Sequence, residues 1–407
     1  MNCRFCGKEI KHLFVSLGKM PLANAFLTAE QMHKKEKMYP LDVYLCDGCF
    51  LVQLPEFEPP EKIFSDYAYF SSCSQTWLEH SMAYVDKMIG LFGINSNSCV
   101  VEVASNDGYL LQYFAERKIP VLGIEPARNV AEAAIKKGIP TEIVFFGTET
   151  ASRILKKNKC ADLILGNNVL AHVPDINDFV AGLKILLKSE GIITMEFPHL
   201  MHLIEGAQFD TIYHEHFSYF SFLTVENIFS AHGLAIFDVE ELSTHGGSLR
   251  IYARHRGYKR LNISERVLKL KQCEIDKGYS KINNYSGFDD KVKKIKSDIL
   301  NFLIRAKNDC KTIVGYGAPA KGNTLLNHCG IKTDLIDYTV DRNPYKQGCY
   351  LPGSHIPIEV PERIKETKPD YIVILPWNIK DEIMEQMYFV REWGAKFVVP
   401  IPTVQVI

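Results

Sequence analysis

The chain has 407 residues, of which 46% are hydrophobic and 23% are charged, with 47 basic and 48 acidic side chains. This length exceeds what one hydrophobic core usually supports, and the near-zero net charge argues against a nucleic-acid partner because it provides no concentrated positive field. No stretch approaches the ~18 apolar residues of a membrane span and the N-terminus has no apolar signal region, so we expect a cytoplasmic protein without a membrane partner.

Two Cys-x-x-Cys pairs open the chain, Cys3 with Cys6 and Cys46 with Cys49. Two thiolates spaced in this way can both reach one tetrahedral ion, provided that residues 7–45 fold back to bring the pairs together. Four thiolates leave no open coordination position, so we predict a structural zinc. A redox pair or unrelated thiols remain the alternatives, while an odd total of eleven cysteines argues against a disulfide framework.

After the cysteine pairs, the chain alternates between strand and helix signals. Residues 76–92 have apolar spacing near 3.6 and predict a helix. Strands are predicted at 99–104, 120–126, 141–146, 161–169 and 191–198, with helices at 129–138 and 178–191. This alternation is typical of a doubly wound parallel α/β sheet.

A charge-rich, largely helical stretch follows at residues 259–309, and a second alternation begins with KTIVGYGAPAKGNTLL at 311–326. Further strands are predicted at 334–341, 370–375 and 395–402. We therefore predict a small zinc-binding domain at 1–70, a central doubly wound domain at 71–258, and a C-terminal Rossmann-like α/β domain at 259–407.

The central alternation contains three signals for an adenosine-containing cofactor. VVEVASNDGYLLQYF reads as a strand, a tight turn and a helix start, but Gly108 is its sole glycine, whereas a dinucleotide fingerprint has three. Glu125 ends the next strand, where a carboxylate would accept both ribose hydroxyls, and a polar loop follows the strand at 161–169. Together these signals favour S-adenosylmethionine over NAD. The predicted cofactor-binding residues are Glu102, Ser105, Asn106, Asp107, Gly108, Glu125, Pro126, Asn129, Asn167 and Asn168.

The stretch FDTIYHEHFSYFS, residues 209–221, places histidines, a glutamate and hydroxyls inside an apolar and aromatic run. An imidazole, an orienting carboxylate and a phenol are the groups needed to remove a proton beside a ketone and to stabilise the resulting enolate. Two alternatives stay open. His214 and His216 would share one face of a strand as metal ligands, although no third ligand of matching spacing is evident, or the cluster is purely structural. We expect His214 to be a structural or supporting group.

The glycine-containing turn GYGAPAKG in the second alternation allows two interpretations. With Asp341 placed 24 positions after Gly317, it could be a second dinucleotide site, which would make the protein an NAD-dependent sugar-modifying enzyme. Its backbone amides could equally cradle the pyrophosphate of a nucleotide-sugar, with Lys321 and Lys346 as counter-charges. A zinc-dependent binding scaffold is the non-enzyme alternative, disfavoured by the lack of a basic excess.

Seven strings resemble, in the same order, those of the nucleotide-deoxysugar C-methyltransferase family. They are SNDGYLL, GIEPARNVA, NNVLAHVPD, FDTIYHEHFSYFS, HGGSLRIY, GYGAPAKGNTLLN and DRNPYKQGCYLPG. The resemblance covers essentially the whole chain, including both cysteine pairs. It implies a zinc domain, a central S-adenosylmethionine domain and a C-terminal domain that helps to hold a nucleotide-sugar, in a monomer or small homo-oligomer.

The resemblance also implies residue roles and an activity. In the family the Tyr-x-Glu-His string carries the chemistry, which gives His216 as the base, Glu215 as its orienter and Tyr213 as a donor near the ketone. His172 and Tyr69 match two further active-site residues. The residues expected to hold the nucleotide-sugar are Gly317, Ala318, Lys321, Gly322, Asn323, Asp341 and Lys346. The expected reaction is S-adenosylmethionine-dependent methylation of the carbon next to the ketone of a nucleotide-linked 4-keto-deoxysugar.

Overall fold

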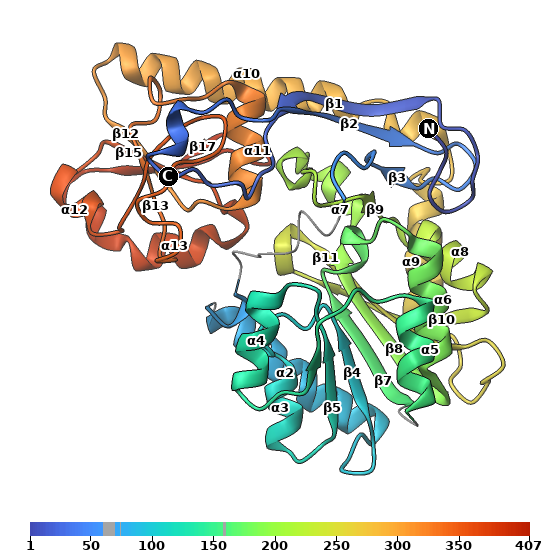
Figure 1. The fold of residues 1–407 in the computed structure, drawn as a ribbon. Coiled ribbons are helices and arrows are strands. Elements are labelled where there is room, and N and C mark those ends of the chain that lie inside the picture. Colours follow the sequence, from blue (N-terminus) through green and yellow to red (C-terminus); the bar gives the residue numbers. More distant parts are fainter. Residues whose placement is uncertain (60–69, 74, 158–159) are drawn as a thin grey trace.

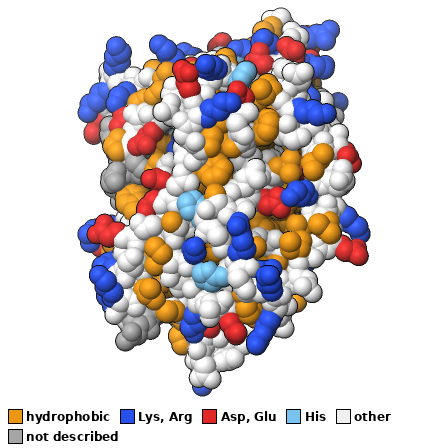
Figure 2. Space-filling view, turned by 90° about the vertical axis from the view of Figure 1, so that its right-hand side faces the viewer, with side chains coloured by type: hydrophobic (Ala, Val, Ile, Leu, Met, Phe, Trp, Pro, Cys, Tyr) orange, Lys and Arg blue, Asp and Glu red, His pale blue; other side chains and the backbone are white. Residues whose placement is uncertain are grey.

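The computed structural model describes residues 1–59, 70–73, 75–157 and 160–407, and the strands in those ranges form three sheets (Figure 1). The N-terminal strands and the C-terminal sheet lie together at one end of the molecule, and the central sheet lies at the other (Figure 1). No helix within the described ranges is long and apolar enough to cross a membrane. Figure 2 shows basic and acidic side chains interspersed with exposed apolar ones over one face.

The N-terminal sheet has four strands in the order β1-β2-β3-β9. β1 (His12–Met20) pairs antiparallel with β2 (Tyr39–Leu45), which in turn pairs with β3 (Val52–Gln53). In β2 every second residue is buried, as expected for a strand with one face on a core. The fourth strand, β9 (Ser218–Tyr219), comes from the central part of the chain, so the predicted catalytic stretch is tied to the N-terminal sheet.

The central sheet contains seven strands in the order β10-β11-β8-β7-β4-β5-β6. Their bounds are β4 (Val100–Val103), β5 (Val121–Ile124), β6 (Thr141–Glu142), β7 (Ala161–Asn167), β8 (Leu187–Pro198), β10 (Leu234–Leu242) and β11 (Ser248–His255). β4 to β8 are parallel, and β10 and β11 complete one edge in antiparallel pairing. The chain runs outward from β4 to β6 and then returns to β7, so the ligand crevice is expected at the carboxyl ends of β4 and β7.

Helices cover both faces of the central sheet (Figure 1). They are α2 (Gln75–Phe92), α3 (Leu111–Glu116), α4 (Arg128–Lys136), α5 (Thr148–Lys156), α6 (Ile176–Leu186), α7 (Leu200–Glu205) and α8 (Phe222–Ala231). Consecutive strand residues face different cores: Val100 packs in the cluster that contains Tyr84 of α2, whereas Val101 packs in the cluster that contains Phe179 of α6. This alternation confirms the predicted doubly wound arrangement.

Two predicted elements of this sheet differ from the structure. The strand predicted at 141–146 ends after Glu142, because the next apolar residues turn toward a cavity that Val144 and Phe146 line. The helix predicted at 178–191 ends at Leu186, and β8 begins immediately because Leu187 pairs with Ala161 of β7.

The C-terminal sheet has six strands in the order β14-β13-β12-β15-β16-β17. They are β12 (Ile313–Tyr316), β13 (Thr339–Val340), β14 (Ile358–Glu359), β15 (Tyr371–Ile374), β16 (Lys396–Val399) and β17 (Gln405–Val406). Counted from β12, this is the strand order of a Rossmann sheet, as predicted, with β17 antiparallel at the edge. α9 (Glu265–Asp276) packs against β10 and α8 of the central part, and it is followed by α10 (Phe288–Asn308), α11 (Ala320–Cys329), α12 (Arg363–Thr367) and α13 (Lys380–Gln386).

Candidate active site

A cavity of about 390 Å³ lies at the carboxyl ends of β4 and β7, where the strand order predicts the ligand crevice. The N-terminal, central and C-terminal regions of the chain all contribute residues to its lining. Asn24 and Phe26 come from the loop after β1, and Lys321 comes from the start of α11. The predicted residues in its wall are Asn106, Glu125, Pro126, Asn167, Asn168, His172, Tyr213, Glu215, His216, Lys321 and Lys346.

Glu125 organises one end of the cavity. Its Oε2 accepts a hydrogen bond from the backbone N–H of Asn106 at 2.9 Å, and its Oε1 accepts one from Ala127 at 2.9 Å. Burial raises the pKa of this carboxyl to about 7, while the two backbone donors oppose the shift. The carboxylate is thereby fixed between the turns that follow β4 and β5, where an adenosine ribose would approach it.

Several polar groups beside Glu125 are suited to a polar ligand. The side-chain Nδ2 of Asn167 and Oδ1 of Asn168 are buried and have no hydrogen-bond partner among the described residues. Asn106 and Asn168 have φ values of 48° and 56°, left-handed conformations that are uncommon for residues other than glycine. These groups fit S-adenosylmethionine, because a bound cofactor would satisfy buried atoms that the chain itself leaves unpaired.

The other predicted cofactor residues are not part of the cavity lining. Glu102 is fully buried on β4, and Asp107 forms an ion pair with Lys137 at 3.0 Å. Ser105 packs against Gly123, and Gly108 adopts φ 75° in the turn. Like Asn129, which lies on α4, these residues do not line the cavity, and their contact with the cofactor stays a prediction.

The predicted catalytic side chains meet at the other end of the cavity. The rings of His172 and His216 have centroids 4.6 Å apart, and those of Tyr213 and His216 lie 4.0 Å apart. The Nδ1 of His216 is 3.0 Å from the carbonyl oxygen of Thr211. A carbonyl can only accept, so Nδ1 carries the proton and Nε2 is left as the basic nitrogen.

Burial also sets the charge of these groups. Burial lowers the pKa of His216 well below 6.5, and the neighbouring His172 adds a smaller shift in the same direction. Burial lowers the pKa of His172 to about 4. Both imidazoles are therefore neutral near pH 7, which leaves each of them able to accept a proton.

Glu215 differs from its predicted role. Asn24 Nδ2 donates to Oε1 at 2.8 Å and to Oε2 at 2.9 Å of this carboxylate, so Glu215 is held by the N-terminal loop. The imidazole of His216 is oriented by the Thr211 carbonyl instead, and the prediction that Glu215 orients it is corrected accordingly. Burial raises the pKa of Glu215 to about 7.

His214 and Tyr69 lie outside this cluster. His214 Nε2 is 3.2 Å from the carbonyl oxygen of Pro40, and its ring packs edge-on against Phe57. Since this histidine contacts the N-terminal sheet while His216 lines the cavity, the two do not form the alternative metal chelate. Tyr69 lies outside the described residues.

The two predicted lysines supply the positive charge of the cavity. Lys321 Nζ donates to Asn378 Oδ1 at 2.7 Å and lies 4.7 Å from the centre of the Trp377 ring. Lys346 Nζ donates to the carbonyl oxygen of Ala318 at 2.8 Å. Burial lowers the pKa of both amines. They are positioned to receive an anionic part of a ligand.

The remaining residues predicted to hold the nucleotide-sugar make contacts within the protein, and their binding role stays a prediction. Asp341 accepts hydrogen bonds from the backbone N–H of Ala318 at 2.7 Å and of Asn343 at 2.8 Å, so its carboxylate is held by two backbone donors, as that of Glu125 is. At Gly317 a Cβ would lie 2.6 Å from the ring of Pro376. Gly322 packs on Leu375, and Asn323 Nδ2 donates to the carbonyl of Ala23 at 2.6 Å. Gly317 and Asp341 are not among the residues that line the cavity, so the alternative NAD site stays a separate prediction.

The cavity residues that the sequence analysis missed include Asn24, Trp77 and His245. Asn24 is brought to Glu215 because the loop after β1 is anchored by Asn323. His245 Nε2 is 2.8 Å from Asn168 Nδ2, and its ring packs edge-on against Trp77. No spacing in the sequence connects these positions, because the contacts join segments that are far apart in the chain.

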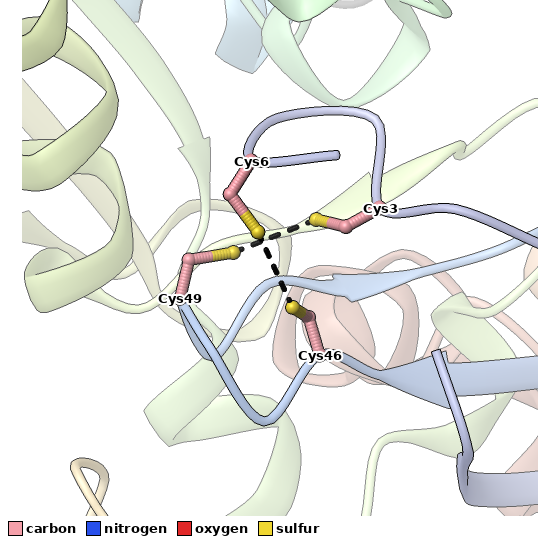
Figure 3. Close-up of side chains that lie close together, drawn as sticks. All are labelled: Cys3, Cys6, Cys46 and Cys49. Carbon is pink, nitrogen blue, oxygen red and sulfur yellow. Dashed lines mark hydrogen bonds between the residues drawn. The ribbon is translucent and has the colours of Figure 1, made fainter. Parts of the chain in front are cut away.

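The four N-terminal cysteines converge at the end of the first sheet (Figure 3). The Sγ atoms of Cys3 and Cys49 are 3.5 Å apart, those of Cys6 and Cys46 are 3.6 Å apart, and all four lie within 4.8 Å of one another. Four thiolates about 2.3 Å from a tetrahedral zinc lie about 3.8 Å from each other. The cluster fits one structural zinc, as predicted.

The chain combines a doubly wound sheet, a buried acidic residue, Glu125, at its ligand crevice and a cluster of four cysteines outside it. These features define the class: an S-adenosylmethionine-dependent methyltransferase with a zinc-binding domain. Three family models match the chain. They are a zinc binding domain at residues 3–64, a methyltransferase domain at 77–239 and a C-methyltransferase C-terminal domain at 243–402.

The chain is 35% identical over 406 residues to C-methyltransferase NovU of Streptomyces niveus, covering 100% of this chain and 96% of that protein. A 98-residue segment is 26% identical to the ubiquinone biosynthesis O-methyltransferase of Bartonella quintana, covering 24% of this chain and 40% of that enzyme. An S-adenosylmethionine-dependent methyltransferase structure from Mesorhizobium loti matches 44% of this chain and 100% of its own, with 14% identity and a TM-score of 0.36. The chain belongs to the C-methyltransferase family.

Proposed function

We propose that this C-methyltransferase methylates the carbon next to the ketone of a nucleotide-linked 4-keto-deoxysugar, through an enolate. The observation that carries this proposal is the fixed tautomer of His216: its Nδ1–H donates to Thr211, and its basic Nε2 belongs to a ring beside Tyr213 in the cavity. A C–H bond offers no lone pair to an electrophilic methyl group. A base and an adjacent ketone overcome this difficulty.

Each side chain has a defined part in the proposed reaction. S-adenosylmethionine supplies the electrophilic methyl group. His216 Nε2 takes the proton from the substrate carbon, and the electron pair moves onto the ketone oxygen. Tyr213 donates a hydrogen bond to that oxygen, and a single preorganised donor of this kind contributes about 3–4 kcal/mol. His172 is neutral beside His216 and provides a second group that can relay the proton.

Lys321 and Lys346 support a nucleotide-linked substrate. Both amines line the cavity on the side formed by the C-terminal region, and Lys346 lies 3.8 Å from Asp341. A pyrophosphate would add a second counter-charge for these buried cations. We further propose that the boundaries 1–70, 71–258 and 259–407 separate the zinc-binding, cofactor-binding and nucleotide-sugar-binding domains.

His216→Asn tests the proposed base. With a 4-keto nucleotide-sugar in deuterated buffer, the wild-type enzyme should exchange the proton next to the ketone even without methyl transfer. His216→Asn should lose exchange and methylation by about 10²–10⁴ while it retains cofactor binding. The exposed His33 allows a matched control, His33→Asn, which should behave like the wild type.

Two outcomes would contradict the proposal. Near-normal exchange in His216→Asn would assign the base to another group. Equal methylation of 4-hydroxy sugars, which have no ketone, would refute the enolate. Mass spectrometry of small molecules retained by the purified protein separates the proposal from the NAD alternative, since retained NAD without S-adenosylmethionine or its demethylated product would favour the latter.

A further inference from the structure

His199, His202 and Glu241 form a second cluster of metal-binding side chains, separate from the cysteines and outside the cavity lining. One ring nitrogen of each histidine and one carboxylate oxygen of Glu241 lie within 4.8 Å of one another. His199 joins β8 to α7, His202 lies on α7, and Glu241 lies on β10. The cluster therefore joins side chains from the start of α7 and from β10.

The first histidine is held as a metal ligand would be. The side chain of His199 is fully buried, and its Nε2 is 2.7 Å from Glu274 Oε1. The Glu274 carboxylate also accepts the backbone N–H groups of Phe222 at 2.7 Å and Leu223 at 2.9 Å. A carboxylate that accepts in this way places the ring proton of His199 on Nε2.

The other nitrogen of His199, Nδ1, is consequently a lone-pair acceptor. It is buried and has no hydrogen-bond partner among the residues that the structure describes. A histidine that donates one N–H to a carboxylate and keeps its other nitrogen bare is the arrangement typical of metal-ligating histidines. An unpaired buried acceptor costs stability unless something else binds it.

The other two side chains are oriented but reachable from solvent. The His202 ring is 79° to that of His199, with centroids 5.3 Å apart, and its Nε2 is 3.6 Å from Glu241 Oε1. A Cβ at Gly247 would lie 2.7 Å from His202 Cγ, so this glycine lets the turn pack against the ring. The side chains of His202 and Glu241 are 33% and 55% exposed, which gives an ion an entry path.

We propose that His199, His202 and Glu241 hold one divalent transition-metal ion, of the borderline class that includes Zn²⁺, Co²⁺ and Ni²⁺. Two imidazoles and one carboxylate suit these ions, and water would complete the coordination. Neighbouring Lys277 is paired with Glu205, which reduces its repulsion of a cation.

The position of the site indicates a bracing role. The Gly247 carbonyl accepts a hydrogen bond from the backbone N–H of His199, so α7 contacts the turn between β10 and β11. That turn carries His245, which lines the cavity and contacts Asn168. An ion that links α7 to β10 would therefore stabilise the loop that forms one wall of the active site.

The test uses Co²⁺ added to full-length protein whose cysteine site is loaded with zinc. Calorimetry and visible absorption should show one Co²⁺ bound through nitrogen and oxygen ligands, with a rise in the thermal midpoint. His202→Ala and the milder Glu241→Gln should each weaken this binding at least tenfold and abolish the rise. The exposed control His33→Ala should leave both unchanged.

Three results would overturn the proposal. One is the absence of Co²⁺ binding to the zinc-loaded wild type. Another is unchanged Co²⁺ affinity in both His202→Ala and Glu241→Gln. The third is a spectrum dominated by thiolate-to-cobalt charge transfer together with released zinc, since this would assign the added ion to the cysteine cluster.

Discussion

Glu215→Gln should make the protein more stable at pH 8 and less active, a combination that tests the electrostatics of the cavity. The side chain is 3% exposed, and the two hydrogen bonds that it accepts from Asn24 come from a neutral amide. The effect of burial therefore exceeds the opposing effect of these hydrogen bonds, and the pKa of the carboxyl rises from 4.5 to about 7.

The size of the effect follows from that pKa. The acid ionises more easily in the unfolded chain than in the native protein, so the free energy of unfolding falls as the pH rises from 4.5 through 7. A shift of about 2.5 pH units at 1.36 kcal/mol each gives a loss of about 3 kcal/mol above pH 7. Glutamine cannot ionise, so the variant should lack this loss.

The assay compares urea and thermal unfolding of wild type and Glu215→Gln at pH 5 and pH 8. The two proteins should differ little at pH 5, whereas the variant should be more stable at pH 8 by up to about 3 kcal/mol. Glu392, which is exposed, allows the control Glu392→Gln, for which no such pH-dependent difference is expected. The reasoning would be refuted if the free energy of unfolding changed with pH in the same way in the wild type and in Glu215→Gln.

Activity provides an independent readout of the same carboxyl. If its ionised form stabilises the imidazolium of His216 after proton abstraction, kcat/KM of the wild type should rise with pH through about 7. Glu215→Gln should be slower and should lack that rise. A variant that keeps the wild-type pH profile and rate would show that Glu215 only anchors the N-terminal loop.

The remaining predictions concern the zinc, the cofactor and the donor. Cys46→Ser should lower the zinc content below about one ion per chain and reduce thermal stability; full zinc content in elemental analysis would contradict the cluster. Glu125→Ala should weaken S-adenosylmethionine binding by about 1.5–3 kcal/mol in calorimetry, and unchanged affinity would place the ribose elsewhere. Tyr213→Phe should reduce kcat less than His216→Asn does, whereas an unchanged kcat would exclude Tyr213 as the donor.

The central and C-terminal sheets could be predicted from the sequence because their signals are local. Buried strands and amphipathic helices show periodicities of 2 and 3.6 within short windows, and their alternation defines the doubly wound class. Strand β9 could not be predicted, since two residues carry no periodicity and its partner β3 lies far away in the chain. The zinc cluster was predictable because each Cys-x-x-Cys pair is itself a local signal.

The proposed catalytic side chains that line the cavity could be chosen from the sequence, whereas the groups that hold them could not. Thr211 acts on His216 through a backbone carbonyl, an atom that every residue carries and that no side-chain pattern reveals. Asn24 reaches Glu215 across 191 positions, and only the folded loop brings the two together.

This loop also shows why the active site depends on the whole chain. Asn323 of α11 donates to Ala23 across 300 positions, next to the residue that binds Glu215. The C-terminal region thus positions an N-terminal side chain on a central carboxyl. Lys321 adds a charge from the same helix as Asn323, so α11 carries both the proposed contact with an anionic substrate group and the residue that anchors the Asn24 loop. A change at α11 is consequently expected to alter substrate binding and the ionisation of Glu215 together.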